Sequence, residues 1–282
     1  MPHPPDLTDR KALLRNRARA AARAQPALFL HQEAALEIQE RLTDVNRRFT
    51  GPAIVTGWPQ FWRDRIPGAE VVEDAETLGL RAGAHDLVIH AMALHWANDP
   101  VGQLIQARRA LKPDGLFLAA LFGGRTLHEL RASLAEAEAA LTGGLSPRVA
   151  PMGEIRALGA LLQRAGFALP VADNVTRTVS YAGILHLMRD LRAMGEANAL
   201  SGRSRRPTPR ALIEDAARRY AQAHAGPDGR IPATFEIICL TGWAPDASQP
   251  QPLRPGSATA RLADVLGAAE TPLPDPAKPQ PD

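Results

Sequence analysis

The chain has 282 residues, of which 45% are hydrophobic, so it is long enough to bury one large α/β core or two small ones. No apolar run approaches the roughly 20 residues that a membrane span needs, and the proline-rich, then polar N-terminus is not typical of a signal peptide. The net charge is +3, and the lone cysteine, Cys239, excludes an internal disulfide. A single cysteine is typical of a reducing compartment, so we expect a cytoplasmic protein.

Arginine dominates the basic residues. Only Lys11, Lys112 and Lys278 are lysines among the 33 basic side chains. Together with the abundant alanine, this bias indicates a GC-rich bacterial genome.

The first predicted element is a basic helix from Arg10 to Arg23, with no acid between Asp9 and Glu33. Such a helix either touches an anionic partner or lies solvated on the surface. No aromatic residues are interleaved for stacking on bases, so we expect no nucleic-acid partner. Peripheral association with a membrane stays open. We favour a solvated helix whose leucines, Leu13 and Leu14, pack on the domain.

A second helix is predicted from Leu28 to Val45, with Ile38 and Leu42 among its apolar positions. Near its start, His31 and Glu33 have the spacing of a two-residue iron site, which requires a second, distant histidine. No such histidine can be identified. The chain is therefore expected to hold no metal.

The stretch from Ala84 to Phe122 predicts strand, loop, helix, turn and strand. The apolar run Asp86 to Ile89 suits a strand buried on both faces, and Asp99 followed by proline suits a helix start. Lys112 to Gly115 turns the chain into a second apolar strand that ends at Phe122. This is a βαβ unit. We therefore expect an α/β fold with a mostly parallel sheet and helices on both faces.

Within this stretch the histidines His85, His90 and His95 are five residues apart. Five residues fit neither one face of a helix nor one face of a strand, so the three do not predict a metal cluster. His90 falls at the carboxyl end of its strand, where open α/β sheets bind ligands.

The remaining elements alternate between helices and strands. Thr126 and Glu129 have the spacing of a capping box for the next helix, and Gly166 suits the end of the helix after it. The predicted helices are 127–141, 153–165, 184–194 and 211–224, and the predicted strands are 171–181 and 233–241. Residues 246–282 form a proline-rich tail with a short amphipathic segment at 257–266.

The blocks DLVIHAMALHWANDP and ARRALKPDGLFLAALFGG carry a resemblance, extended by FGGRTLHELR, GGLSPRVAP and LMRDLRAMGEANAL. They resemble class I S-adenosylmethionine (SAM)-dependent methyltransferases, and more narrowly the branch of the arginine hydroxylases that assemble mitochondrial respiratory complex I. A more distant resemblance is to the malonyl-carrier-protein methyltransferases of biotin synthesis. It covers roughly residues 9–245. It implies a Rossmann-like fold, SAM as cofactor and a protein partner. A subunit of respiratory complex I is one candidate for that partner.

The resemblance fails around the first two strands. Ala53 to Gly57 stands where the family has its first strand and glycine-rich loop, yet Trp58 and Pro59 replace the further glycines. Those glycines let the backbone approach the cofactor, and proline removes one N–H donor. A full second strand and its helix do not fit before Val71. We therefore expect a truncated fold with a degenerate SAM site.

The resemblance nominates specific site residues. For the cofactor it nominates Gly57, Asp74, Ala75 and His90, with Asp74 near the adenine edge, although a helix cap explains Asp74 equally well. For a substrate or partner pocket it nominates His95, Trp96 and Arg125. His95 and Trp96 either line the pocket or pack the loop, and Arg125 either holds a carboxylate or is an exposed loop residue. The loop 143–148 is expected to fold over the site, and no catalytic residue is assigned.

These observations predict a disordered N-terminus at 1–8, a helical region at 9–48, a methyltransferase-like domain at 49–245 and the tail at 246–282. The favoured function is a methyltransferase-family protein with a degenerate cofactor site that modifies or assembles another protein. An active SAM-dependent methyltransferase and a scaffold without catalysis stay open as alternatives.

Overall fold

The structure is a computed structural model that describes residues 6–250 and residue 267. Residues Met1–Asp246 form one compact unit, and Ala247–Asp282 form a second. The predicted segment at 257–266 lies outside the described residues. Within the described part of the chain, no helix is long and apolar enough to cross a membrane.

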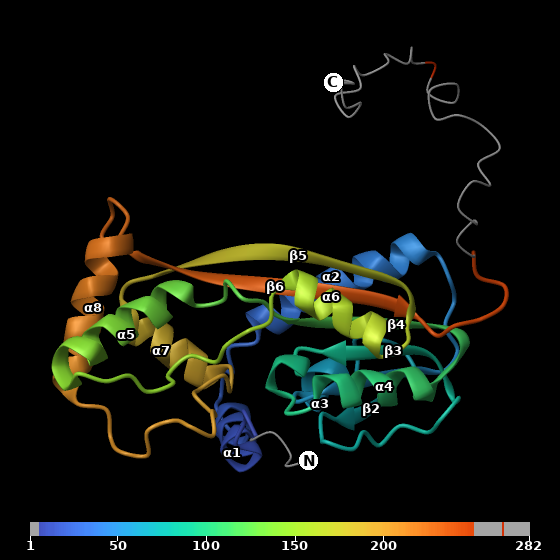
Figure 1. The fold of residues 1–282 in the computed structure, drawn as a ribbon, viewed down its shortest axis with the longest axis horizontal. Helices are drawn as coiled ribbons and strands as arrows, with labels where there is room; N and C mark the ends of the chain where they lie inside the picture. Colours follow the sequence, from blue (N-terminus) through green and yellow to red (C-terminus); the bar gives the residue numbers. More distant parts are fainter. Residues whose placement is uncertain (1–5, 251–266, 268–282) are drawn as a thin grey trace, which may run out of the picture. The chain divides into compact units, whose positions relative to one another are not determined.

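Helices and strands are interspersed along the first unit (Figure 1). In chain order they are α1 (Arg10–Ala21), α2 (Phe29–Val45), β1 (Pro52–Thr56), α3 (Pro59–Trp62), β2 (Glu70–Glu73), β3 (His85–Ala91), the 3-10 turn η1 (Leu94–Trp96), α4 (Pro100–Ala110), β4 (Leu111–Phe122), α5 (His128–Thr142), α6 (Ile155–Arg164), β5 (Ala168–Tyr181), α7 (Ile184–Ala193), α8 (Arg210–His224) and β6 (Ile231–Trp243).

The strands form one six-stranded sheet in the order β2-β1-β3-β4-β6-β5. β2, β1, β3 and β4 run parallel, whereas β6 is antiparallel to both β4 and β5. The βαβ unit predicted from the central stretch is β3, α4 and β4. Asp99 caps α4 as expected, because its carboxylate accepts a hydrogen bond from the Gly102 N–H at 2.8 Å. The predicted α/β fold with a mostly parallel sheet is confirmed.

Helices cover both faces of the sheet, and the strands divide their side chains between them. On β4, Leu118 and Phe122 belong to the core with α2, α5, α7 and α8, whereas Phe117 and Leu121 belong to the core with α4 and α6. This period of two buries every residue of the strand from Gly115 to Phe122, as expected for a strand that helices cover on both faces.

The sheet is short on the side of β1. A doubly wound sheet with strand order 3-2-1-4-5-6 has two strands outside its first one, whereas only β2 lies outside β1 here. Between Gly57 and β2 the chain forms a single helical turn, α3, of four residues. The truncation predicted from the sequence is therefore present, and it brings the strand that leads to Asp74 directly beside β1.

The predicted capping box of α5 is wrong. Glu129 does not reach back to the helix start, because its carboxylate accepts hydrogen bonds from the hydroxyl and N–H of Thr234 on β6. Thr126 is bonded to the backbone of Glu236 instead, and the residue at the cap position, Leu127, forms no side-chain cap. Both side chains therefore fasten α5 to the sheet.

Candidate functional site

The four residues predicted for cofactor binding meet at the carboxyl edge of the sheet. Gly57 follows β1, Asp74 and Ala75 follow β2, and His90 lies at the end of β3. Gln103 of α4 links two of them, because its Oε1 lies 2.7 Å from His90 Nε2 and its Nε2 donates to the Ala75 carbonyl at 3.0 Å. Ligands of open α/β sheets bind outside this edge.

This edge is filled by an arginine of α1. Arg17 Nη1 donates to both carboxylate oxygens of Asp74, at 2.8 and 2.9 Å, and the two side chains are only 6% and 3% exposed. Arg10 adds a hydrogen bond of 3.2 Å to Asp74 Oδ2 and one of 2.7 Å to its carbonyl. A Cβ placed on Gly57 would lie 2.7 Å from Arg17 Nε. Gly57 is therefore covered by a guanidinium group.

The two arginines keep Asp74 ionised. Burial by itself raises the pKa of the Asp74 carboxyl, but the charges of Arg17 and Arg10 outweigh it and hold that pKa below its ordinary value. Arg17 Nε and Nη2 are buried and have no hydrogen-bond partner among the described residues. No helix follows Asp74, so the helix-cap interpretation of this residue is wrong.

SAM does not fit the edge in this arrangement. The space against Gly57 is taken by Arg17, and both carboxylate oxygens of Asp74 are bonded to arginines. After Gly57 the chain enters α3, whose first residue, Pro59, has no N–H to offer. Trp58 is 4% exposed and packs in the core against His31, with ring centroids 6.0 Å apart. The loop thus places large side chains where the resembled family exposes backbone N–H groups to the cofactor.

Two buried histidines near the edge are neutral. Burial lowers the pKa of His31 to about 3, and burial lowers that of His90 to about 4 although Gln103 opposes this shift. His31 Nδ1 accepts a hydrogen bond from Trp62 Nε1 at 3.1 Å, so His31 anchors α2 to α3. The described residues contain no cluster of three or more metal-ligating side chains, and the spacing of His31 and Glu33 is not part of one.

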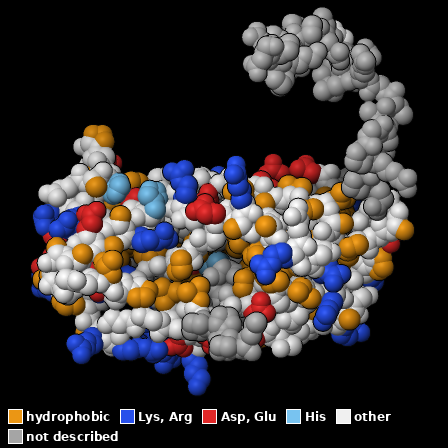
Figure 2. Space-filling view, in the orientation of Figure 1, with side chains coloured by type: hydrophobic (Ala, Val, Ile, Leu, Met, Phe, Trp, Pro, Cys, Tyr) orange, Lys and Arg blue, Asp and Glu red, His pale blue; other side chains and the backbone are white. Residues whose placement is uncertain are grey.

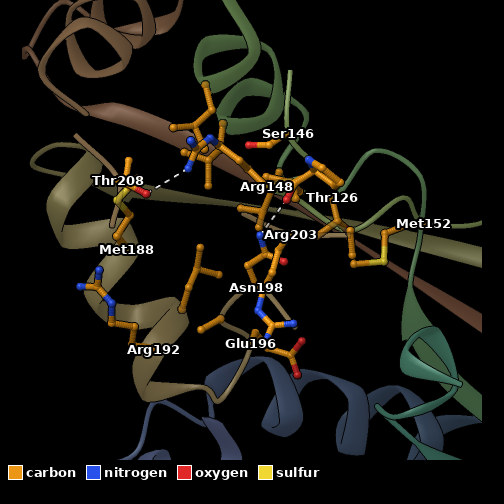
Figure 3. A pocket seen from close by; sticks show the side chains of 18 of the residues that line it. Thr126, Ser146, Arg148, Met152, Met188, Arg192, Glu196, Asn198, Arg203 and Thr208 are labelled. Carbon is orange, nitrogen blue, oxygen red and sulfur yellow. Dashed lines mark hydrogen bonds between the residues drawn. The ribbon is translucent and has the colours of Figure 1, made fainter. Parts of the chain in front are cut away.

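A cavity of about 540 Å³ opens beyond the end of β4. Figure 2 shows hydrophobic side chains gathered around a hollow on this face, and Figure 3 shows the side chains that line it. Most of the lining is apolar, and the apolar residues include Trp96, Phe122, Leu130, Leu134, Met188 and Phe235. A volume of roughly 300 to 1,000 Å³ with a mostly apolar lining is typical of ligand pockets.

Glu196 brings one buried carboxylate into this cavity. Its Oε2 accepts a hydrogen bond from Trp96 Nε1 at 2.7 Å and lies 3.4 Å from His95 Nε2, and its side chain is 8% exposed. Burial raises the pKa of Glu196, but its contact with His95, the charge of Arg17 and the Trp96 N–H lower that pKa below its ordinary value. Trp96 lines the cavity, whereas His95 packs beneath it against Phe122, with ring centroids 4.8 Å apart.

Two of the three arginines that line the cavity are paired with carboxylates. Arg148 Nη2 bonds Glu138 Oε1 at 2.6 Å, and Arg203 Nη2 bonds Asp9 Oδ2 at 2.9 Å. Figure 3 also shows the hydrogen bond from Arg148 to Thr208. Residues 146–148 of the loop 143–148 line the cavity. That this loop folds over a functional site stays a prediction.

Arg125, nominated for the pocket, is exposed and is not among the residues that line the cavity. Its backbone N–H donates to Glu236 Oε2 at 3.0 Å, which fixes the loop rather than the guanidinium. A role for Arg125 toward a partner outside the cavity stays a prediction.

We expect α1 to be a solvated helix whose leucines pack on the domain, and Leu13 does pack, at 0% exposed. The helix also buries the charged side chain of Arg17, which we did not predict. Arg10 and Arg17 turn inward because they share a helix face with Leu13 and Ala20, at spacings of three and four residues. Leu14, which we expected to pack, is 50% exposed. This spacing could have shown from the sequence alone that the two arginines share a face with buried residues. Glu196 had no such signal, since its partner Trp96 is 100 residues away.

Comparisons with known proteins show what the chain is similar to. Residues 17–119 match the family described as a methyltransferase domain. Over 200 residues the chain is 41% identical to a mitochondrial arginine hydroxylase of Danio rerio, a match that covers 71% of this chain and 62% of that protein. Over 177 residues it is 36% identical to a malonyl-[acyl-carrier protein] O-methyltransferase of Methylovorus, covering 63% of this chain and 57% of that protein.

The chain thus spans about 60% of the length of the curated relatives it matches. Among solved structures, the YcgJ protein of Bacillus subtilis is 11% identical, with a TM-score of 0.49 and coverage of 76% of this chain and 99% of that one.

The packing of α1 against the end of α7 can be tested at Gly195. There φ is +79°, and an added Cβ would lie 3.1 Å from the Arg17 Cα. Gly195→Ala is expected to cost about 1 to 2 kcal/mol for the left-handed backbone, and more for the contact with α1. The matched control is Gly229→Ala, where φ is +74° and nothing lies within 4 Å. Urea unfolding of both variants should show the larger loss at Gly195. Equal losses would mean that α1 does not pack against this glycine.

The buried neutral histidines predict a pH dependence of stability. Their folded-state pKa values, about 3 and about 4, lie below the ordinary 6.5, so the unfolded chain binds more protons below that pH. Stability is therefore lost as the pH falls from 6.5 toward 4, by about 2 kcal/mol per histidine at about pH 5. Urea midpoints measured across this range should fall, and His90→Gln should flatten the slope. A midpoint that is constant between pH 7 and 5 would contradict the assignment.

Proposed function

Because residues 17–119 match the methyltransferase-domain family, we propose that this chain is a methyltransferase-fold protein that acts on another protein and does not hold SAM at the edge of β1. The observation that carries the proposal is the guanidinium group of Arg17 over Gly57. In this reading α1 takes the place that the cofactor has in an active relative. The SAM site is degenerate, and the fold serves to recognise a partner.

Three features support a degenerate site over an active one. Asp74 is bonded to two arginines, so its carboxylate is not free for a cofactor. The sheet lacks one strand outside β1, and with it the acid that would hold the ribose hydroxyls. The remaining loop runs through Trp58 and Pro59, which offer neither small size nor a full set of N–H groups.

The relatives indicate the kind of partner. The vertebrate proteins at about 40% identity are named arginine hydroxylases, so we propose that this chain recognises an arginine side chain of a protein. The resemblance to the complex I branch nominates a subunit of respiratory complex I as that protein. Because the chain spans only part of those relatives, hydroxylation itself is not part of the proposal. We further propose that the protein resides in a bacterial cytoplasm, which follows from its composition.

Isothermal titration with SAM and with S-adenosylhomocysteine tests the proposal. We expect no binding heat at millimolar ligand for the wild-type chain, because the ligand would have to displace a buried ion pair. The variant Arg17→Ala distinguishes two possible causes of lost SAM binding: the arginine that covers Gly57 and the altered loop that follows it. Since Trp58 and Pro59 remain in this variant, it should not reach micromolar affinity either.

Micromolar binding of SAM by the wild-type chain would contradict the proposal and favour an active methyltransferase. Micromolar binding by Arg17→Ala alone would assign the loss to the arginine and not to the loop. In both cases the wild-type and Arg17→Ala titrations are compared with Arg210→Ala, which removes an arginine of α8 whose side chain is 91% exposed and pairs with Glu214 on the same helix.

A further inference from the structure

Glu196 is placed by the end of α7. Gly195 adopts the left-handed conformation, the Glu196 N–H bonds the Leu191 carbonyl at 2.9 Å, and the Gly195 N–H bonds the Arg192 carbonyl at 3.3 Å. This is the Schellman arrangement, which fixes the residue after the glycine. Figure 3 shows Glu196 at the base of the cavity, beyond the end of α7 and above α1. Its position is therefore set by backbone hydrogen bonds, and it does not depend on a flexible loop.

Only one of the two carboxylate oxygens of Glu196 forms hydrogen bonds with described residues. Oε2 is held by Trp96 and His95, whereas Oε1 has no hydrogen bond to any described residue. The side chain is more than nine-tenths buried and lines the cavity. Oε1 is not among the buried polar atoms that lack a partner, so it is accessible from the cavity, where a ligand can donate a hydrogen bond to it.

Of the charged residues that line the cavity, Glu196 is the carboxylate, and Arg148, Arg192 and Arg203 are cations. Arg148 and Arg203 are bonded to Glu138 and Asp9, and Figure 3 shows Arg192 pointing away from Glu196. The charge of Arg17 on the side of α1 helps to keep Glu196 ionised. The cavity therefore presents one fixed negative charge that faces a mostly apolar space.

The side chains that line the cavity favour a cation of a particular shape. The aromatic rings of Trp96 and Phe122 and the leucines and methionines of the lining suit a long aliphatic stem. A planar guanidinium donates through several N–H groups to a carboxylate and also stacks on aromatic faces, which an ammonium group does less well. Both properties are combined in an arginine side chain.

We infer that Glu196 and Trp96 form a subsite that binds the guanidinium group of an arginine side chain from a protein partner. The inference rests on the proposed function, because it assigns the residues that would recognise the partner. It makes Glu196 a binding residue for the substrate, and Trp96 both its hydrogen-bond donor and a wall of the subsite. No step of catalysis is assigned to either residue.

Isothermal titration of the full chain with two small probes tests this subsite. The first probe is acetyl-arginine methylamide, and the second is acetyl-citrulline methylamide, which has the same length but carries a neutral urea group. We expect the arginine probe to bind the wild-type chain at least about tenfold more tightly, since hydrogen bonds to a charged group are stronger. In Glu196→Gln this preference should vanish.

Glu196→Gln keeps an amide oxygen that can accept the Trp96 N–H, so the cavity wall is preserved; unchanged thermal unfolding and tryptophan fluorescence confirm this. The matched control is Glu136→Gln, an exposed glutamate on α5 that pairs with Arg219 and does not line the cavity. Glu136→Gln should keep the wild-type preference for arginine.

A wild-type chain that binds neither probe, or binds both equally, overturns the subsite. A preference for arginine that persists in Glu196→Gln overturns it as well. These results are distinct from a failure of the proposed function: SAM binding by the wild-type chain would refute the degenerate cofactor site while leaving the arginine preference intact.

Discussion

The ion pair between Arg17 and Asp74 is the contact on which the rest of the site depends. Both side chains are nearly inaccessible to water, and removing each charge from water costs several kcal/mol before their attraction offsets it. The pair is sustained because Nη1 of Arg17 reaches both oxygens and Arg10 adds a second guanidinium. It draws α1 onto the edge of the sheet. That position of α1 also requires Gly195, whose missing side chain makes room for the Arg17 backbone.

Two consequences follow from the position of α1. At the edge of β1 it takes the space against Gly57 that a methyltransferase leaves for its cofactor. At the end of α7 it lies beneath Glu196, whose carboxylate faces the cavity beyond β4. The chain thus has a mostly parallel sheet with one strand outside β1, while its ligand-sized cavity lies between β4, α5 and α7. In our account, binding has moved from the first strands of the sheet to this second site.

Much of the fold could be predicted from the sequence because its signals are local. The apolar run of β3, the Asp99-Pro100 start of α4 and Gly166 after α6 are each encoded within a few residues. The shortened segment after Gly57 also predicted the missing strand. The site could be predicted only in part: Asp74, His90 and Trp96 were nominated and their roles stay predictions, whereas Arg17 and Glu196 were not nominated. Their partners lie 57 and 100 residues away, and periodicity carries no information about such pairs.

A double-mutant cycle on Arg17 and Asp74 tests the central claim most directly. The variants are Arg17→Met, Asp74→Asn and the double substitution, each compared with the wild-type chain by urea unfolding at neutral pH. If the two side chains form a buried pair at the edge of β1, each single variant is strongly destabilised and the coupling energy is about 2 kcal/mol or more. A coupling energy below about 0.5 kcal/mol would mean that Arg17 does not occupy the edge in solution, and the cofactor space would then be open.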